Sequence, residues 1–469
     1  MKRSRRAFLR QSCGALSAAA VAAGVRRFGL INALAQRSAP ADYRALVCVF
    51  LNGGNDCNNT VVPLDPAGYQ AYSSARSASG LAIAQGSLLP IMPPSIGTAF
   101  GLHPSLTELQ TLWSQQKLAI ACNVGPLVHP MTRDQYRNNS VPKPYQLFSH
   151  SDQVAQWQTS VSNTRAQTGW GGRLADRTIG FNGGVAFPMV TSVAGSNIFN
   201  SGLNTRPLVI AAAPTGLNQV LSLNGFGGSA EEVARRNSMT HLRTIDRTNM
   251  LVAAASDTTQ QAIDISQTFS ADPTLATVFP TTTLGNQLKQ VAKVMKLNQT
   301  SPQLSLERQI FFCSLGGFDT HQDQPASQAS LLAQVSQAMK AFYDATIELG
   351  IESKVTTFTL SDFGRTLQPS GSGASVGTDH GWGNHLFVMG GAVRGGDFYG
   401  TPGPNGTVFP TLQMAGPCDT DSRGRWIPTA SVEQYAATLA LWYGLSQSDL
   451  SVVFPLIGNF ATSSLGFMM

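Results

Sequence analysis

The residues best suited to chemistry in this sequence are aspartates and histidines that stand beside short apolar runs. Three runs end in glycine-containing turns that carry Asp56, Asp319 with His321, and Asp362. A fourth glycine-rich segment comes before another apolar run and carries Asp379, His380 and His385. Carboxylate oxygens and imidazole nitrogens bind zinc and manganese, and carboxylates also bind calcium. These seven residues are therefore the predicted ligands of a divalent metal.

Each of these motifs also has an ordinary structural explanation when it is taken alone. An aspartate at the end of a strand often caps a helix or forms a turn, and a nearby histidine is often only hydrogen-bonded. The motifs weigh more together, because three of the seven histidines fall in two short segments that also contain acids.

A second candidate feature lies at residues 147–152, where Ser149 and His150 precede a helix-like stretch. We predict both as catalytic residues, with Ser149 as the nucleophile, because a helix N-terminus offers free N–H groups to an anion. The alternative is that Ser149, Ser151 or Asp152 simply caps the helix. Three residues near Asp56 compete for the nucleophile's role: Asn58, Asn59 and Thr60.

Three arginines near glycines are candidates to bind a phosphate or sulfate group, with ordinary surface roles as the alternative. They are Arg173, Arg365 and Arg394.

The elements that would position these residues follow from the apolar pattern. Six short apolar runs predict buried strands, and most lack the alternation typical of a strand with one solvated face. These runs span residues 46–51, 118–122, 207–211, 310–315, 355–360 and 386–389. Helical patterns lie between them, and one stops at Gly350 while another begins with a capping box from Ser431 to Gln434. Strands that alternate with helices predict an α/β fold, a three-layer αβα sandwich with a mainly parallel, doubly wound sheet.

The chain is predicted to hold one folded domain, residues 36–469. Residues 228–300 are polar and helical without a strong strand, and we interpret them as a helical insertion or cap.

The first 35 residues have the pattern of a twin-arginine signal peptide. Arg5 and Arg6 stand in the run SRRAFLR, an alanine-rich stretch follows, and the small-residue cleavage site ends at Ala35. The apolar stretch is too short to span a bilayer, so no stable membrane anchor is expected. The twin-arginine translocase and signal peptidase are the predicted partners, and the periplasm or the extracellular space is the predicted location.

Removal of this segment changes the charge of the chain. Seven of the 32 Lys and Arg residues lie in residues 1–35, so 25 bases remain against 26 acids, a net charge of −1. The basic character of the whole chain therefore gives no support for nucleic-acid binding. Of the five cysteines beyond the signal, Cys57 and Cys418 lie in predicted loops, and whether they pair is left open.

Several motifs together resemble the bacterial domain-of-unknown-function 1501 family. The resemblance rests on FLNGGND at 50–56, GLHP at 101–104, FSH at 148–150, GWGGR at 169–173, GFDTH at 317–321, DFGR at 362–365 and GTDHG at 377–381. It implies membership of the alkaline phosphatase/sulfatase-like fold group, whose metal-dependent enzymes use a strand-end Asp, an Asp and His pair, an adjacent Asp-His and a last His.

This resemblance implies roles for individual residues. Asp56 is similar to the first acid, and Asp319 with His321 is similar to the middle pair. Phe363 stands where the adjacent Asp-His would carry its imidazole, which is a departure from the pattern. Two alternatives stay open: His380 or His385 is the last histidine, or Asp379 with His380 is the Asp-His pair.

The predicted function is that of an exported, metal-dependent hydrolase of phosphate, phosphonate or sulfate esters. Its substrate would be a small molecule or a glycan ester. The alternative is a non-catalytic relative that keeps the fold as a binding or assembly module of the cell envelope.

The export prediction is testable at the arginine pair. Replacing Arg5 and Arg6 with lysines should leave the chain uncleaved in the cytoplasm, because the translocase reads that pair. Immunoblots of cell fractions measure this, and a variant that still appears outside the cytoplasm beginning at Gln36 would contradict the assigned route.

Overall fold

The structure is a computed structural model that describes residues 42–185, 187–220, 227–269, 271–301 and 304–469. The predicted signal peptide, residues 1–35, lies outside this part of the chain. No helix among the described residues is both long enough and apolar enough to cross a membrane.

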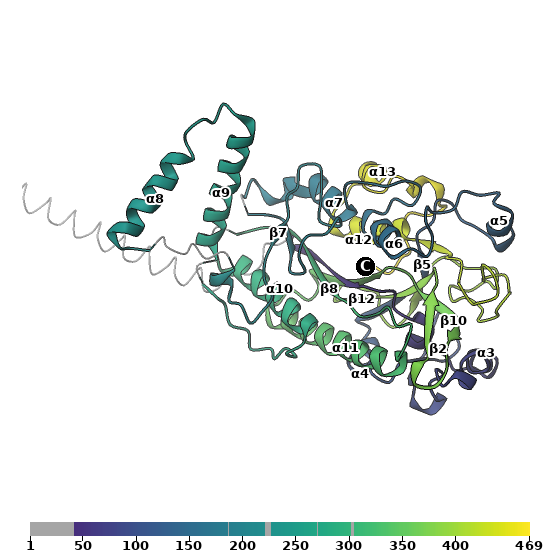
Figure 1. Ribbon diagram of the computed structural model, residues 1–469. Helices are drawn as coiled ribbons and strands as arrows, with labels where there is room; N and C mark the ends of the chain where they lie inside the picture. Colours follow the sequence, from purple (N-terminus) through teal and green to yellow (C-terminus); the bar gives the residue numbers. More distant parts are fainter. Residues whose placement is uncertain (1–41, 186, 221–226, 270, 302–303) are drawn as a thin grey trace, which may run out of the picture.

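A nine-stranded sheet lies at the centre of the molecule (Figure 1). Its strands are β1 (Arg44–Leu51), β5 (Leu118–Gly125), β6 (Val190–Ser192), β7 (Leu208–Val209), β8 (Arg308–Leu315), β9 (Val355–Ser361), β12 (Asn384–Gly390), β13 (Phe398–Tyr399) and β14 (Ala430–Ser431). Their order is β13-β5-β12-β9-β1-β8-β6-β7, with β14 beside β5. Every pairing is parallel except the two that β12 makes, with β5 and β9. The predicted α/β fold with a mainly parallel sheet is confirmed, and all six predicted strands are present.

Helices cover both faces of this sheet (Figure 1). One face carries α4 (Thr107–Ser114), α10 (Thr283–Thr300) and α11 (Gln324–Glu348). The other carries α6 (His150–Thr159), α7 (Trp170–Thr178), α12 (Val432–Tyr443) and α13 (Leu450–Val453). Alternate side chains of β1 enter two separate cores, Val47 and Val49 on one side, Leu46 and Cys48 on the other. The sandwich is therefore three-layered, as predicted.

Smaller elements surround the sandwich. They are α2 (Cys57–Thr60), α3 (Pro66–Arg76), α5 (Arg133–Asn138), the three-stranded sheet of β2 (Val61–Pro63), β4 (Phe100–Leu102) and β3 (Leu89–Ile91), and the hairpin of β10 (Arg365–Ser370) and β11 (Gly377–His380).

Two predicted helix boundaries agree with the structure. Helix α11 ends just before Gly350, which has a φ of +66°, a conformation that favours glycine. Helix α12 starts at the predicted capping box, in which the Ser431 side chain accepts from the Gln434 N–H and the Gln434 side chain accepts from the Ser431 N–H.

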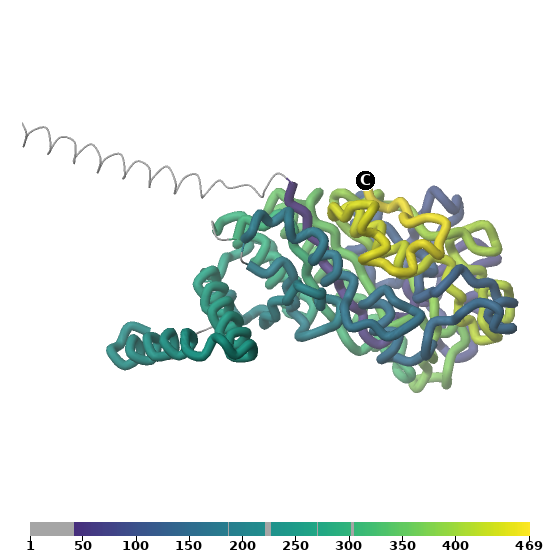
Figure 2. The backbone as a smooth tube through the Cα atoms, turned by 90° about the horizontal axis from the view of Figure 1, so that it is seen from above, coloured from purple at the N-terminus to yellow at the C-terminus, as the bar shows by residue number. Residues whose placement is uncertain are grey.

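The predicted insertion divides into two parts with different environments. Helices α8 (Ala230–Leu242) and α9 (Met250–Thr268) form a hairpin that projects from the body, which Figure 2 shows from above. Helix α10 instead packs against β8 and α11, because it has an apolar face that includes Leu284, Leu288 and Val291. The projecting part therefore ends before α10, and α10 belongs to the core.

All five cysteines among the described residues are free and buried. Cys57 and Cys418 thus do not form the disulfide that the sequence left open.

Candidate metal site

Three turns meet at one edge of the sheet because the last residues of the strands before them are paired with one another. Leu51, the last residue of β1, pairs with Leu315 of β8 and with Ser361 of β9. The turns that follow carry Asp56, Asp319 and Asp362, so all three acids start from the same edge.

The turn after β1 packs very closely against the other two turns. Gly53 has a φ of +117°, and a Cβ atom there would lie 2.3 Å from the backbone nitrogen of Asp319. Its N–H donates to Asp362 Oδ1 at 2.9 Å. A residue without a side chain is therefore required for the turns of β1, β8 and β9 to meet.

The fourth predicted segment reaches this edge because β12 runs antiparallel. Its first residue, Asn384, pairs with Val124 near the end of β5. The segment before β12 therefore lies at the carboxyl edge of the parallel strands, and β11 brings His380 opposite Arg365 of β10.

His150 is the first residue of α6 and so comes from the helical layer of α6, α7, α12 and α13. The loop before it has two non-glycine residues in the left-handed region, Gln146 at φ +47° and Phe148 at φ +70°. This conformation is uncommon for a bulky residue and is often found at functional sites. The Phe148 carbonyl faces His380, and Arg425 lies over the Phe148 ring at 4.7 Å.

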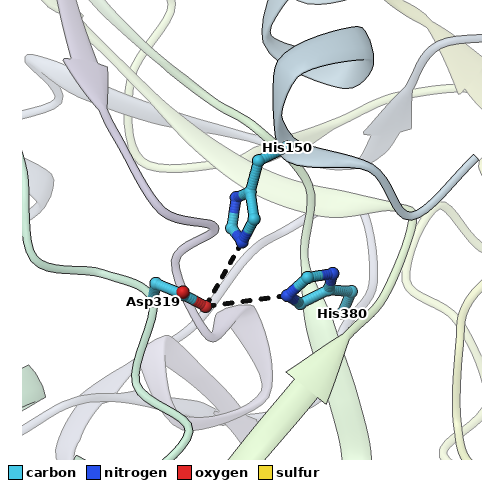
Figure 3. A group of neighbouring side chains, drawn as sticks. All are labelled: His150, Asp319 and His380. Atoms are coloured by element: carbon cyan, nitrogen blue, oxygen red, sulfur yellow. Dashed lines mark ion pairs between the residues drawn. The ribbon is translucent and has the colours of Figure 1, made fainter.

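The three side chains of His150, Asp319 and His380 converge on one point (Figure 3). One ligand atom of each lies within 4.8 Å of those of the other two. His150 Nε2 lies 3.4 Å from Asp319 Oδ1, and His380 Nε2 lies 3.7 Å from the same oxygen. The Asp319 side chain is 47% exposed, so the cluster opens to solvent.

Hydrogen bonds on the far side of each imidazole decide which nitrogen carries the proton. His150 Nδ1 lies 2.8 Å from Asp362 Oδ2, and His380 Nδ1 lies 2.7 Å from the Phe148 carbonyl oxygen. These oxygens accept hydrogen bonds, so each Nδ1 donates its proton and each neutral ring keeps its lone pair on Nε2. Both lone pairs face the Asp319 carboxylate, and His150 Nε2 is buried without a hydrogen-bond partner. Three such acceptors repel one another unless a cation lies between them.

His321 adds a third imidazole beside this group. Its Nε2 lies 3.0 Å from Asp319 Oδ1 and 3.0 Å from His380 Nε2, while its Nδ1 faces Asp379 Oδ1 at 3.2 Å. Asp379 in turn is paired with Arg423. Asp379 thus orients His321, and the cluster offers up to four ligands.

The pKa shifts in the cluster follow from these contacts. The hydrogen bond that His150 donates to Asp362 raises the pKa of His150 above 6.5. Burial lowers the pKa of His380, which keeps this ring neutral near pH 7. Burial alone would raise the pKa of Asp319, but the hydrogen bond that it accepts from Arg365 and the positive charges around it lower this pKa below 3.8.

Two of the predicted ligands lie apart from the cluster. Asp56 is fully buried, and its two oxygens accept from Arg76 at 2.6 and 3.1 Å, with Gln324 bound at 2.5 Å as well. His385 is buried in β12, where its Nδ1 accepts from the Asn123 N–H at 3.1 Å and burial lowers its pKa to about 3. We therefore correct the ligand set by removing both residues, since one is neutralised by an interior arginine and the other lies in the core.

Asp362 and Phe363 take positions that differ from the expected Asp-His pair. Asp362 is fully buried and holds His150 and Gly53, so it orients a ligand rather than facing the open side. The Phe363 ring stacks on His380 at 4.7 Å and lies 4.8 Å from the His150 ring. Phe363 thus packs against the two imidazoles and supplies an apolar wall.

Ser149 precedes His150 in the chain and is the N-cap of α6. Its hydroxyl donates to Asp152 Oδ2 at 2.8 Å and makes no bond to the backbone of α6. The simple capping role weighed for Ser149 is therefore not what its side chain does.

Two of the arginines considered as anion clamps have structural roles instead. Arg173 is buried and donates to the carbonyls of Val453, Thr168 and Thr159. Arg365 is buried and donates to carbonyls of the turns around it, as well as to Asp319.

A family model described as a protein of unknown function, DUF1501, matches residues 43–408. The chain belongs to the DUF1501 family. No curated protein matches it.

Among solved structures, the chain is similar to the zinc complex of the C-terminal periplasmic domain of EptC from Escherichia coli. The identity is 8%, 76% of this chain and 74% of that chain are covered, and the TM-score is 0.33. It is also similar to the lipoteichoic acid synthase LtaP from Listeria monocytogenes, with 7% identity, 86% and 80% covered, and a TM-score of 0.28. Scores this low transfer neither a site nor a function to this DUF1501 protein.

The pairing of His150 with Asp362 predicts a pH-dependent contribution to stability in the metal-free protein. Because the folded pKa of His150 is raised above 6.5, the pair stabilises the fold below pH 6.5 and this stabilisation is lost as the pH rises through the folded pKa. Asp362→Asn should lower the pKa of His150, measured by NMR titration of the histidine ring protons with His150→Gln for assignment. His385 serves as the internal control, because it should not titrate above pH 5. An unchanged His150 titration in Asp362→Asn would contradict this assignment.

Proposed function

We propose that this protein is an exported, metal-dependent hydrolase of phosphate, phosphonate or sulfate esters. The observation that carries the proposal is the convergence of His150 Nε2, His380 Nε2 and the Asp319 carboxylate, with the far side of each ring held by a hydrogen-bond acceptor. A hydrogen-bond acceptor on the second ring nitrogen is typical of histidines that bind metals.

The residues present fit zinc best among the candidate metals. Two imidazoles and a carboxylate, with His321 as a further ligand, match the donor set of zinc sites, and manganese is the next choice. Calcium fits less well, because it takes six to eight oxygen ligands. A bound divalent ion would polarise an ester oxygen and lower the pKa of a hydroxyl nearby.

The groups around the cluster favour an anionic substrate. The N-terminus of α6, a ten-residue helix, begins at His150, and free N–H groups there attract anionic oxygens. Arg423 and Arg425 line the same region, with side chains 33% and 21% exposed. The choice of phosphate, phosphonate or sulfate esters rests on the family resemblance together with this charge.

Within this proposal, Ser149 attacks the phosphorus or sulfur atom of the ester and Asp152 accepts its proton. The bond to the alcohol breaks, Asp152 passes the proton to the leaving oxygen, and water then releases the transferred group from Ser149. The Ser149 hydroxyl already donates to Asp152 at 2.8 Å, so the proton has an acceptor in place. Asp362 and the Phe148 carbonyl keep the two imidazoles in a single orientation, and Phe363 excludes water from one side of them.

One observation favours the alternative, a non-catalytic binding module. Asp56 is neutralised by Arg76 and Asp362 is committed to His150, so the acids that would hold a second metal are occupied. A protein of this kind would bind one metal ion, or an anionic ligand, without turnover.

The metal proposal predicts about one divalent ion per chain in protein purified without chelators. Asp319→Ala and His380→Ala should each lose it, because each removes one of three converging ligands. His241→Gln, which changes an exposed histidine of α8, is the matched control and should keep the ion. Mass spectrometry of the metal content measures this, and equal content in all four proteins would refute the site.

The nucleophile proposal predicts that Ser149→Ala lowers the turnover of aryl phosphate or sulfate esters roughly a thousandfold or more. Its unfolding free energy should change by less than about 0.5 kcal/mol, because the hydroxyl does not cap α6. Ser151→Ala, whose hydroxyl lies 3.3 Å from that of Ser149, is the control. Full activity in Ser149→Ala would remove this residue from the mechanism, while a wild-type protein that binds metal without turnover would favour the binding module.

A further inference from the structure

The part of β11 that carries Asp379 and His380 is not held by a regular strand ladder. The register of β10 and β11 shifts between the pair Arg365 and His380 and the pair Pro369 and Thr378. Pro369 has no N–H to donate, so it cannot complete the ladder opposite Thr378. Other contacts must therefore fix this part of β11, on which the position of His380 depends.

Thr378 makes such contacts with all three of its polar groups. Its N–H donates to the Thr320 carbonyl at 3.1 Å, and its carbonyl accepts from Arg365 Nη1 at 2.8 Å. Its hydroxyl donates to Gln324 Oε1 at 2.6 Å. Because Thr320 belongs to the turn after β8, Thr378 joins two of the segments that supply the metal cluster.

The Gln324 amide is fixed from its other side by a buried ion pair. Gln324 is the first residue of α11, and its Nε2 donates to Asp56 Oδ2 at 2.5 Å. The Asp56 carboxylate is paired with Arg76 and only accepts hydrogen bonds, so the amide nitrogen must face Asp56 and the amide oxygen must face Thr378. The side chains of these four residues are at most 1% exposed. They form a continuous buried network that ends on β11.

We propose that Gln324 and Thr378 are positioning residues of the metal site, which raise its affinity for the ion without contacting it. This inference rests on the proposed function, because it concerns the same cluster. His380 lies two residues after Thr378, so a displacement of Thr378 would move His380 Nε2 relative to the Asp319 carboxylate. Loss of a group that orients a ligand costs about 10–100-fold in metal affinity.

The test is a titration of the metal-free full chain with zinc against a competing chelator. Thr378→Val keeps the shape of the side chain but removes the hydroxyl, and it should weaken zinc binding about 10–100-fold. Thr378→Ser restores the hydroxyl and should bind zinc nearly as tightly as the wild type. A residue with only a structural role would lower the stability and leave the zinc affinity of the folded protein unchanged.

A second variant tests the other end of the same hydrogen bond. Gln324→Asn has a side chain that is shorter by a methylene and cannot reach both Asp56 and Thr378. It should lose zinc affinity as Thr378→Val does, and it carries the test if Thr378→Val does not fold. The double variant should lose no more than either single variant, because both break one network.

The matched control is Thr346→Val, which removes a buried hydroxyl elsewhere in α11 that donates to the Tyr343 carbonyl at 2.6 Å. It should bind zinc as the wild type does, and a similar loss there would assign the effect to stability. Unchanged affinity in Thr378→Val and Gln324→Asn would overturn the positioning role and leave the metal site in place. Equal weakening by Thr378→Ser would also overturn it. Absence of zinc binding by the wild type would refute the metal site itself and this inference with it.

Discussion

The arrangement of the site depends on one buried charge, the guanidinium of Arg365. It follows β9 and is only 1% exposed, yet the acid paired with it, Asp319, is 47% exposed. The guanidinium also donates to the Gly54 carbonyl at 3.0 Å, the Gly53 carbonyl at 2.8 Å and the Thr378 carbonyl at 2.8 Å. Burial of a charge is costly unless all its donors are bonded. The turns after β1 and β8 and strand β11 must therefore stay close to this residue.

Each of the three candidate ligands is held in place by one partner behind it. Arg365 holds Asp319, Asp362 holds His150, and the Phe148 carbonyl holds His380. The partners come from β10, the turn after β9 and the loop before α6, so the edge of the sheet, the β10–β11 hairpin and one helical layer contribute to one point. This division, with buried partners behind and exposed ligands in front, leaves the open side free for a metal or substrate.

Local patterns predicted much of the fold because they depend on neighbouring residues. The six apolar runs became strands, and Ser431, Gln434 and Gly350 marked helix ends through contacts within a few residues. The direction of β12 was not predicted, although a signal existed. The segment between β9 and β12 contains no helical pattern long enough for the crossover that a parallel strand requires.

The composition of the site was less predictable because it depends on contacts between distant residues. Nothing local distinguishes Asp319, which faces the cluster, from Asp56, whose charge is balanced by Arg76 20 residues away. His150 and Asp362 lie 212 residues apart in sequence, and their pairing makes His150 a candidate ligand as well as a catalytic residue. His385 is five residues from His380, but it belongs to a buried strand and meets the core.

The most direct test of the central claim is a crystal structure of the protein grown with zinc, with anomalous data collected at the zinc absorption edge. The account predicts a single strong anomalous peak bonded at about 2.0–2.2 Å to Nε2 of His150, Nε2 of His380 and a carboxylate oxygen of Asp319. A peak held by Asp56 or His385 instead, or no peak at the cluster while both Nε2 atoms still face Asp319, would contradict it.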